Sequence, residues 1–329
     1  MKKKLLFSHW TAAKKYSIPY LDVYFAHELA LLEERGVEQV IVFDRNERFY
    51  NKAYDVHTTT VISQEIACIE RNNESIVCIE QVFLQIAQDV DIQRAILLGN
   101  LICSKFSGST PLSSRDALIT YIEKCVKHRG RRHALRALQY IKDAYDSPLV
   151  MHVDMLLNLP YKLGGYKLGN PKFQHEILIP VEILGESSIV LYHAEIFYPD
   201  HDVILDLSSL GEKTNTVNSR ELLPKLEELG YSVIKLEEAV LYDIHQLHNL
   251  MKYISQVLKK RLRIHTDSFE ENRYALHSLL PPRDDTRPED TETITEQNKI
   301  EEADTMQHLL QYYTRINDMK DFTSLPLPR

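Results

Sequence analysis

The sequence predicts one α/β globular domain followed by an acidic tail, and three observations support this. Strand, helix and strand patterns follow one another over residues 3–44 and again over residues 203–239, as in a sheet covered by helices. Apolar residues make up 44% of the 329 residues, enough to bury a sizeable core. After residue 266 the chain becomes acidic and nearly free of large apolar side chains, which ends the predicted domain.

The first unit contains a helix predicted over residues 19–36. Leu21, Phe25, Leu29 and Leu32 recur at helical spacing, and Gly36 supplies the stop signal. The apolar runs on either side, KKLLFSH and VEQVIVFD, have the pattern of strands. The three segments form a βαβ-like unit.

Strand and helix signals alternate through the rest of the domain. HTTTVISQEIACIE and SIVCIEQVFLQIA together predict a strand and a helix, whereas Gly99-Asn100 between two apolar runs indicates a hairpin. Helices are predicted from Ser113 onward. Strands are then predicted in HEILIPVEIL, IVLYHAEIFY and DVILDLSS, a helix in SRELLPKLEELG, a strand in YSVIKLEEA and a helix in YDIHQLHNLMKYISQVLKKRLRI.

The chain is therefore divided into three predicted parts. Residues 1–266 form the α/β domain, residues 267–304 an acidic disordered linker, and residues 305–329 a short amphipathic helix and tail. The terminal helix is a candidate for contact with a protein partner.

Composition excludes several classes of protein. A net charge of −8 and a pI near 6.0 argue against extensive nucleic-acid contact. No apolar run reaches the roughly 18 residues of a membrane helix, and the N-terminal apolar patch is too short for a signal peptide. We therefore expect a cytoplasmic protein without membrane contact.

The cysteines and glycines limit the chemistry further. The four cysteines match no zinc pattern, so we expect reduced structural thiols and no metal site. With 10 glycines the chain has no GxGxxG or GxxxxGK[ST] motif, and no cofactor is predicted. Neither GxSxG nor HExxH occurs.

One pair of residues is the main catalytic candidate. SPLVMHVDMLLNLP, residues 147–160, has the apolar run of a buried strand, with His152 and Asp154 two positions apart. In a strand these side chains project from the same face, where an imidazole can move a proton and a carboxylate can orient it or hold a cation. The alternative is that His152 caps the strand and Asp154 pairs with an arginine or lysine.

This segment resembles the His-x-Asp strand of the arginine deiminase and amidinotransferase group, the pentein superfamily. The closing strand–helix–strand of residues 203–239 is similar to the closing unit of those proteins. The resemblance implies that VEQVIVFD is the early strand that ends in a substrate-binding acid, here Asp44. STPLSSRDALITYIEKC resembles their Ser-x-Arg-Thr-Asn turn and the helix after it, with Ser114 and Arg115 in the turn. The resemblance implies a pentein-like propeller.

The sequence departs from that group where its catalytic cysteine should stand. YDIHQLHNLMKY has His245 and His248 there, and no cysteine or glycine; neither residue type simply replaces a thiolate nucleophile. The resemblance therefore implies binding of a guanidine-type or other cationic ligand, with the hydrolase or transferase chemistry lost or altered. Asp44 and Asp154 would face the cation, His152 would handle the proton, and Arg115, His245 and His248 would contact the ligand.

A second resemblance implies a different fold. DSPLVMHVDMLLNLP followed by LGNPKFQHEIL is similar to the amino-acid pocket of tryptophanyl- and tyrosyl-tRNA synthetases, which implies a Rossmann-like nucleotide-binding sheet. KKYSIPYLD lacks their His-x-Gly-His turn, and GEKTNT keeps only Lys213 of their signature loop.

A third interpretation is a non-catalytic interaction module. Residues 124–136 form the one dense basic stretch, which we call the basic patch. Lys127, Arg129, Arg131 and Arg132 could bind an anion or phosphate, or they could be a solvated helix face.

Overall fold

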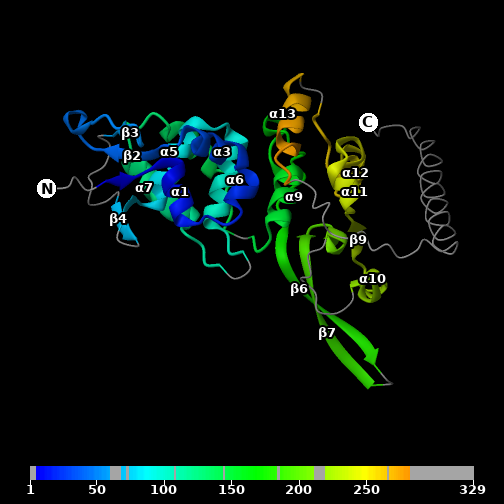
Figure 1. Cartoon of the computed structure of the whole chain (residues 1–329). Coiled ribbons are helices and arrows are strands. Elements are labelled where there is room, and N and C mark those ends of the chain that lie inside the picture. The colour runs from blue at the N-terminus through cyan, green and yellow to red at the C-terminus, as the bar shows by residue number, and fades with distance from the viewer. Residues whose placement is uncertain are drawn as a thin grey trace, which may run out of the picture. The chain divides into compact units, whose positions relative to one another are not determined.

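A computed structural model describes residues 5–59, 68–71, 74–106, 109–143, 145–183, 186–210, 219–264 and 267–281 of the chain. These residues belong to one compact unit that ends at Pro281 (Figure 1). The predictions for Lys213, for the linker beyond residue 281 and for the helix in residues 305–329 lie outside the described residues.

The N-terminal part of this unit contains a five-stranded sheet of order β3-β2-β1-β5-β4. Its strands are β1 (Leu6–Phe7), β2 (Glu38–Val42), β3 (Tyr54–Thr58), β4 (Cys68–Arg71) and β5 (Glu74–Val77). β1 is central and pairs parallel with β5 but antiparallel with β2. The predicted first unit therefore exists as strand, helices and strand, but its two strands run in opposite directions.

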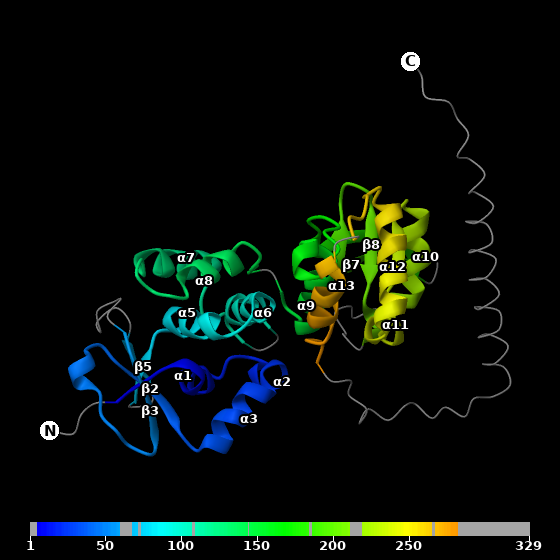
Figure 2. The same ribbon diagram turned by 90° about the horizontal axis from the view of Figure 1, so that it is seen from above.

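Helices accompany this sheet in the N-terminal part of the unit. They are α1 (His9–Tyr16), α2 (Leu21–Tyr24), α3 (Ala26–Arg35), α5 (Ile79–Asp89), α6 (Ile92–Cys103), α7 (Arg115–Lys124) and α8 (Arg131–Leu138). α5 contacts α1 on one side and α7 and α8 on another (Figure 2). The helix predicted over residues 19–36 is divided at Phe25 into α2 and α3, but the burial that its apolar pattern predicts is confirmed for Leu21, Phe25, Leu29 and Leu32.

The hairpin predicted at Gly99-Asn100 is wrong, since both residues lie inside α6. A side chain on Gly99 would overlap Ile141, so the glycine permits close packing instead of a turn. Asn100 accepts a hydrogen bond from the Lys142 main-chain N–H at 3.0 Å. Tertiary contacts thus explain both residues that resembled a turn signal.

The strand predicted over residues 147–160 is also wrong, because the segment forms helix α9 (Pro148–Asn158). Ser147 caps the helix, with its Oγ accepting from the N–H groups of Leu149 and Val150 at 3.1 and 3.2 Å, and Pro148 occupies the first turn, where its missing N–H is harmless. α9 is buried nearly all round. A continuous apolar run of this kind does not distinguish a buried helix from a buried strand.

A second sheet has the order β6-β7-β8-β9. Its strands are β6 (Lys172–Ile183), β7 (Glu186–Tyr198), β8 (Val203–Asp206) and β9 (Ser232–Lys235), and α10 (Ser219–Glu228) connects β8 to β9. β8 and β9 pair in parallel, so the closing strand–helix–strand unit is confirmed. The α/β class is confirmed too, but the described strands form two open mixed sheets and no closed propeller.

Three helices follow the second sheet: α11 (Glu238–Tyr242), α12 (Ile244–Val257) and α13 (Asp267–His277). The compact unit extends past residue 266, the end of the predicted domain, because α13 buries Phe269 and Leu276 in the core. None of the described helices is both long and apolar enough to cross a membrane.

Gly164 fixes the position of α13. Its φ is +79°, and a Cβ there would collide with the main-chain oxygen of Asn272. The Nε2 amide of Gln93 donates to that same oxygen at 2.8 Å and to the carbonyl of Leu163 at 3.0 Å. The glycine therefore provides both a left-handed backbone and a close approach of two chain segments.

Replacing Gly164 with alanine is expected to lower the free energy of unfolding by roughly 2–4 kcal/mol, from left-handed strain and overpacking together. Urea unfolding measures this difference. Gly36→Ala is the matched control, because φ is +59° there but no atom lies within 4 Å of the added Cβ; a loss of about 1 kcal/mol is expected. Equal losses in the two variants would refute the contact between Gly164 and α13.

Candidate active site

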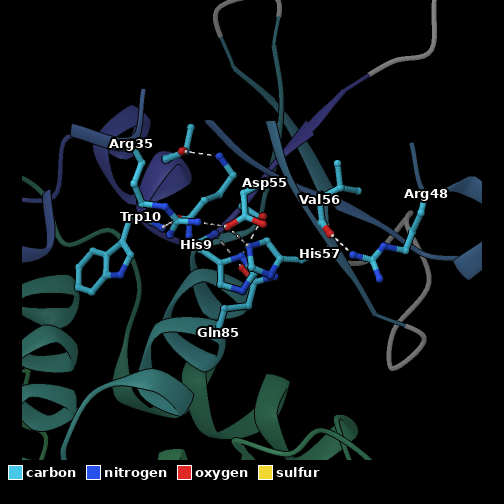
Figure 3. Close-up of polar contacts among 11 residues, drawn as sticks. His9, Trp10, Arg35, Arg48, Asp55, Val56, His57 and Gln85 are labelled. Atoms are coloured by element: carbon cyan, nitrogen blue, oxygen red, sulfur yellow. Dashed lines mark hydrogen bonds and ion pairs between the residues drawn. The ribbon is translucent and has the colours of Figure 1, made fainter. Parts of the chain in front are cut away.

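Ser8 and His9 lie at the junction of β1 and α1, where two glutamines satisfy the helix start (Figure 3). The His9 N–H donates to Oε1 of Gln85 at 3.1 Å, and the Trp10 N–H donates to Oε1 of Gln39 at 2.9 Å. The first N–H groups of a helix have no partner inside it, so these amides replace the usual cap. Nδ1 of His9 lies 2.9 Å from Oγ of Ser8.

Strand β3 brings an acid and a second imidazole to this junction. Asp55 and His57 are two positions apart and share a face of the strand. Nε2 of His57 lies 3.7 Å from Oδ2 of Asp55, and the rings of His57 and His9 are 3.9 Å apart between centroids. We call His9, Asp55, His57 and Gln85 the histidine site.

Two arginines flank the histidine site (Figure 3). Nη2 of Arg35 donates to Oδ2 of Asp55 at 3.3 Å, and Nη2 of Arg48 donates to the carbonyl of Val56 at 3.1 Å. Both guanidinium groups act electrostatically on His57. Each uses one nitrogen in these contacts, so N–H donors remain on both within the described part of the chain.

Burial keeps the histidines neutral. It lowers the pKa of His9 to about 3, with smaller contributions from His57 and His128. Burial also lowers the pKa of His57, and this effect exceeds the opposing effect of Asp55. Both imidazoles are therefore uncharged at neutral pH.

The geometry selects one tautomer of His57. Its Nε2 is buried and has no hydrogen-bond partner among the described residues, and the nearest carboxylate is that of Asp55. At 3.7 Å the carboxylate is beyond hydrogen-bond distance, but its negative charge favours a proton on Nε2, which leaves Nδ1 as the basic nitrogen. The His57 side chain is 33% exposed, so the ring is reachable from solvent through its other atoms.

The basic patch lies close to the histidine site through His128, which precedes α8 and acts electrostatically on His9. Lys127, Arg129 and Arg132 are exposed, and Arg131 is half-buried with its Nε donating to the carbonyl of Ile122 at 3.3 Å. Within the described residues none of these four cations forms an ion pair with an acid. Among the described residues, the positive charges of the basic patch are therefore not neutralised by ion pairs with acidic side chains.

Helix α5 carries two buried amide donors, one of which belongs to the histidine site. Nε2 of Gln85 and Nε2 of Gln81 are buried and find no hydrogen-bond partner among the described residues. Oε1 of Gln81 accepts from the hydroxyl of Tyr121 at 2.8 Å. In the part of the chain that the structure describes, no group of three or more His, Cys, Asp or Glu could hold a metal ion. The groups present suit proton transfer and anion binding.

The structure does not place the predicted pair side by side. His152 and Asp154 lie on a helix, where a two-residue step turns through roughly 200°. His152 is 0% exposed, and its Nε2 lies 3.3 Å from the carbonyl of Leu276. Burial lowers its pKa to about 3. The expected acid–base pair on one face is therefore absent.

Asp154 is a structural carboxylate. It accepts hydrogen bonds from Nζ of Lys142 at 2.7 Å, from Nδ2 of Asn158 at 2.6 Å and from the hydroxyl of Tyr145. Tyr198 extends this network by donating to Oδ1 of Asn158 at 3.2 Å. The alternative interpretation, in which Asp154 pairs with a basic residue, agrees with these contacts.

The predicted ligand-contacting residues are dispersed. Asp44 accepts from the N–H of Asn46 at 2.9 Å as the cap of a short 3-10 helix over Arg45–Glu47, and it shares no partner with Asp154 among the described residues. Arg115 begins α7, and its Nε donates to the carbonyl of Leu138 at 2.8 Å.

The two predicted histidines of α12 have different surroundings. His245 is exposed, and its N–H donates to Asp243 at 2.8 Å. His248 is partly buried, with Nδ1 2.6 Å from the hydroxyl of Tyr166. Neither is in contact with His152 or Asp154 among the described residues. The structure therefore does not assemble the expected cation pocket.

The prediction missed the acid–histidine pair of β3 although its signal was present. Asp55-Val56-His57 has the same two-residue spacing that singled out His152 and Asp154. The contribution of His9 has no local signal, because 45 residues separate it from Asp55.

Comparisons of the chain with protein-family models, with curated proteins and with solved structures gave no match. The fold and the site define a mixed α/β protein with a neutral histidine pair between arginines.

Proposed function

We propose that the protein binds a small anionic ligand at the histidine site and that His57 accepts a proton there. The observation that carries this proposal is a neutral imidazole with the Asp55 carboxylate 3.7 Å from its Nε2 and with Arg35 and Arg48 on either side (Figure 3). A neutral imidazole held by a carboxylate is the ordinary arrangement of a general base.

Two carboxylates, Asp55 and Asp89, and two guanidinium groups act electrostatically on His57; the guanidinium groups are the contacts that an anion would use. Arg35 and Arg48 retain guanidinium N–H donors, which bind carboxylate or phosphate oxygens well. The neighbouring basic patch adds uncompensated positive charge. A cationic, guanidine-type ligand has less support, because the Asp55 carboxylate already contacts Arg35 and the Asp154 carboxylate contacts Lys142.

Asp55 supports the proton transfer in two ways. Its negative charge favours the tautomer with the proton on the nearer nitrogen, Nε2, and it stabilises the imidazolium that forms when Nδ1 accepts a proton. Because burial lowers the pKa of His57, the base stays unprotonated as the pH falls below 6.5. The proton-accepting step is therefore expected to persist in mildly acidic solution.

Inorganic pyrophosphate is the first probe. In imidazole NMR spectra it is expected to shift the ring signals of His57, and the double variant Arg35→Gln/Arg48→Gln is expected to bind it at least about 10-fold more weakly. Arg45→Gln is the matched control, because Arg45 is exposed and begins the neighbouring 3-10 helix. An unmoved His57 signal, or an equal loss in the control, would contradict the anion site.

The proton-accepting role is tested separately, by hydrolysis of bis(p-nitrophenyl) phosphate. His57→Gln is expected to lower the rate by about 100-fold or more, and Asp55→Asn by a smaller factor. His245→Gln, an exposed histidine of α12, is the control. Hydrolysis at the wild-type rate in His57→Gln, or none in the wild type, would refute the general-base role and leave the binding result standing.

A further inference from the structure

Arg273 of α13 is a buried cation without a carboxylate partner in the described part of the chain. It is 5% exposed. Its Nη1 donates to the hydroxyl of Tyr166 at 3.5 Å, a long contact, and its Nε is buried with no hydrogen-bond partner among the described residues. The guanidinium otherwise lies near the rings of Phe269 and Tyr274, at 6.0 and 5.4 Å.

A guanidinium in this environment requires an anion. Buried arginines are almost always paired, because removing the charge from water is costly unless hydrogen bonds or an opposite charge compensate it. Glu270, three residues earlier on α13, acts electrostatically on His248 but makes no ion pair with Arg273 in the described structure. The described residues therefore leave the charge only partly compensated.

The neighbouring polar groups form a directed chain of donors. Nη1 of Arg273 donates to the Tyr166 oxygen, so the Tyr166 hydroxyl is free to donate to Nδ1 of His248 at 2.6 Å. Nδ1 is then the acceptor nitrogen, which places the proton of a neutral His248 on Nε2. Lys252 lies one helical turn further along α12 and also acts on His248.

The packing holds these groups in place. The rings of Tyr166 and Phe269 pack edge to face, with their centroids 5.6 Å apart and an interplanar angle of 80°. Gly164 allows the main chain of α13 to approach closely at Asn272, next to Arg273. His248 is only partly buried and Tyr274 is exposed, so the cluster lies just beneath the surface. The groups are held in place, but an anion that reaches Nε has to displace the side chains that cover it, because Nε itself is buried.

We propose that Arg273 and His248, positioned by the Tyr166 hydroxyl between them, bind a small oxyanion, a carboxylate or a phosphate, which supplies the missing partner of the buried guanidinium. Nε of Arg273 is the principal donor, and His248 and Lys252 contribute from α12. This site shares no residue with the histidine site, so each proposal stands or fails by itself.

Inorganic phosphate and acetate are the probes, each compared with sodium chloride at the same ionic strength. In the full chain, at least one of them is expected to shift the Nε–H resonance of Arg273 and to raise the melting temperature. The arm that responds identifies the class of oxyanion. If neither phosphate nor acetate shifts the resonance or raises the melting temperature, the proposal is refuted.

Arg273→Met keeps most of the side-chain volume and is expected to fold, since replacing an unpaired buried charge by an apolar group is often neutral or stabilising. It should lose the anion-dependent rise in melting temperature. Tyr166→Phe should bind the anion about 10-fold more weakly, because Arg273 and His248 lose their bridging hydroxyl. Arg263→Met, at an exposed position after α12, is the matched control and should respond as the wild type does.

An anion response in Arg273→Met equal to that of the wild type would refute the site, as would an equal loss in Arg263→Met. If Arg273→Met does not fold, the Nε–H resonance of wild-type Arg273 and the Tyr166→Phe variant decide the matter. Pyrophosphate binding at His57 is a separate readout, so its failure leaves the Arg273 result unaffected.

Discussion

Replacing Asp154 with alanine is expected to lower the free energy of unfolding by about 3–5 kcal/mol, because it breaks a buried ion pair by removing one partner. Asp154 is 3% exposed. Its carboxylate receives donors from Lys142, Tyr145 and Asn158, and all three lose their acceptor in the variant. Unsatisfied donors beside a partly buried ammonium group are costly.

Urea unfolding at neutral pH measures this loss. The matched control is Glu33→Ala, which removes a carboxylate 2.6 Å from Nζ of Lys14, where the two side chains are 66% and 42% exposed. An exposed pair of this kind is worth less than about 1 kcal/mol. Similar losses in the two variants would show that the buried network around Asp154 does not stabilise the fold.

Acidification below pH 6.5 is expected to destabilise the protein through His152. The residue is 0% exposed, and burial lowers its pKa to about 3 in the folded chain. Above pH 6.5 the imidazole is neutral in both folded and unfolded chains and has no effect. Below that pH the unfolded chain binds a proton that the folded chain does not, so the free energy of unfolding falls by up to about 1.4 kcal/mol per pH unit.

The contribution of His152 reaches about 2 kcal/mol at pH 5 and grows until the pH approaches 3. Urea unfolding at pH 7, 6 and 5 gives the slope. The glutamine of His152→Gln cannot titrate, so the slope of the unfolding free energy against pH is expected to fall by the contribution of about one proton. His245→Gln, at an exposed position, should retain the wild-type slope. His9 adds to the wild-type slope in the same direction. An unchanged slope in His152→Gln would contradict the prediction.

The elements that were predictable from sequence have a one-sided apolar pattern. Leu21, Phe25, Leu29 and Leu32 recur on one face and are buried in the structure, and the β8–α10–β9 unit follows the apolar and polar alternation of its segments. In these segments the spacing of apolar residues distinguishes helix from strand without knowledge of the neighbours.

The elements that sequence reasoning missed are buried on all sides or depend on contacts between distant residues. α9 was predicted as a strand because it is apolar nearly all round, and Gly99 was assigned to a turn although it packs against Ile141. The compact unit also includes α13, within the predicted linker, since a few buried side chains hold that helix against the core. Such contacts have no local signal.

The candidate site also combines residues that a local pattern reveals with residues that the fold brings together. The α/β class and the closing strand–helix–strand could be predicted from the sequence, and the Asp55-Val56-His57 spacing, although overlooked, is equally visible there, since each is a pattern between near neighbours along the chain. The contact between His57 and His9 depends on the fold, because β3 and the start of α1 come together through the sheet. The fold also makes His152 and Asp154 point apart, because packing selected a helix where the apolar pattern allowed either form.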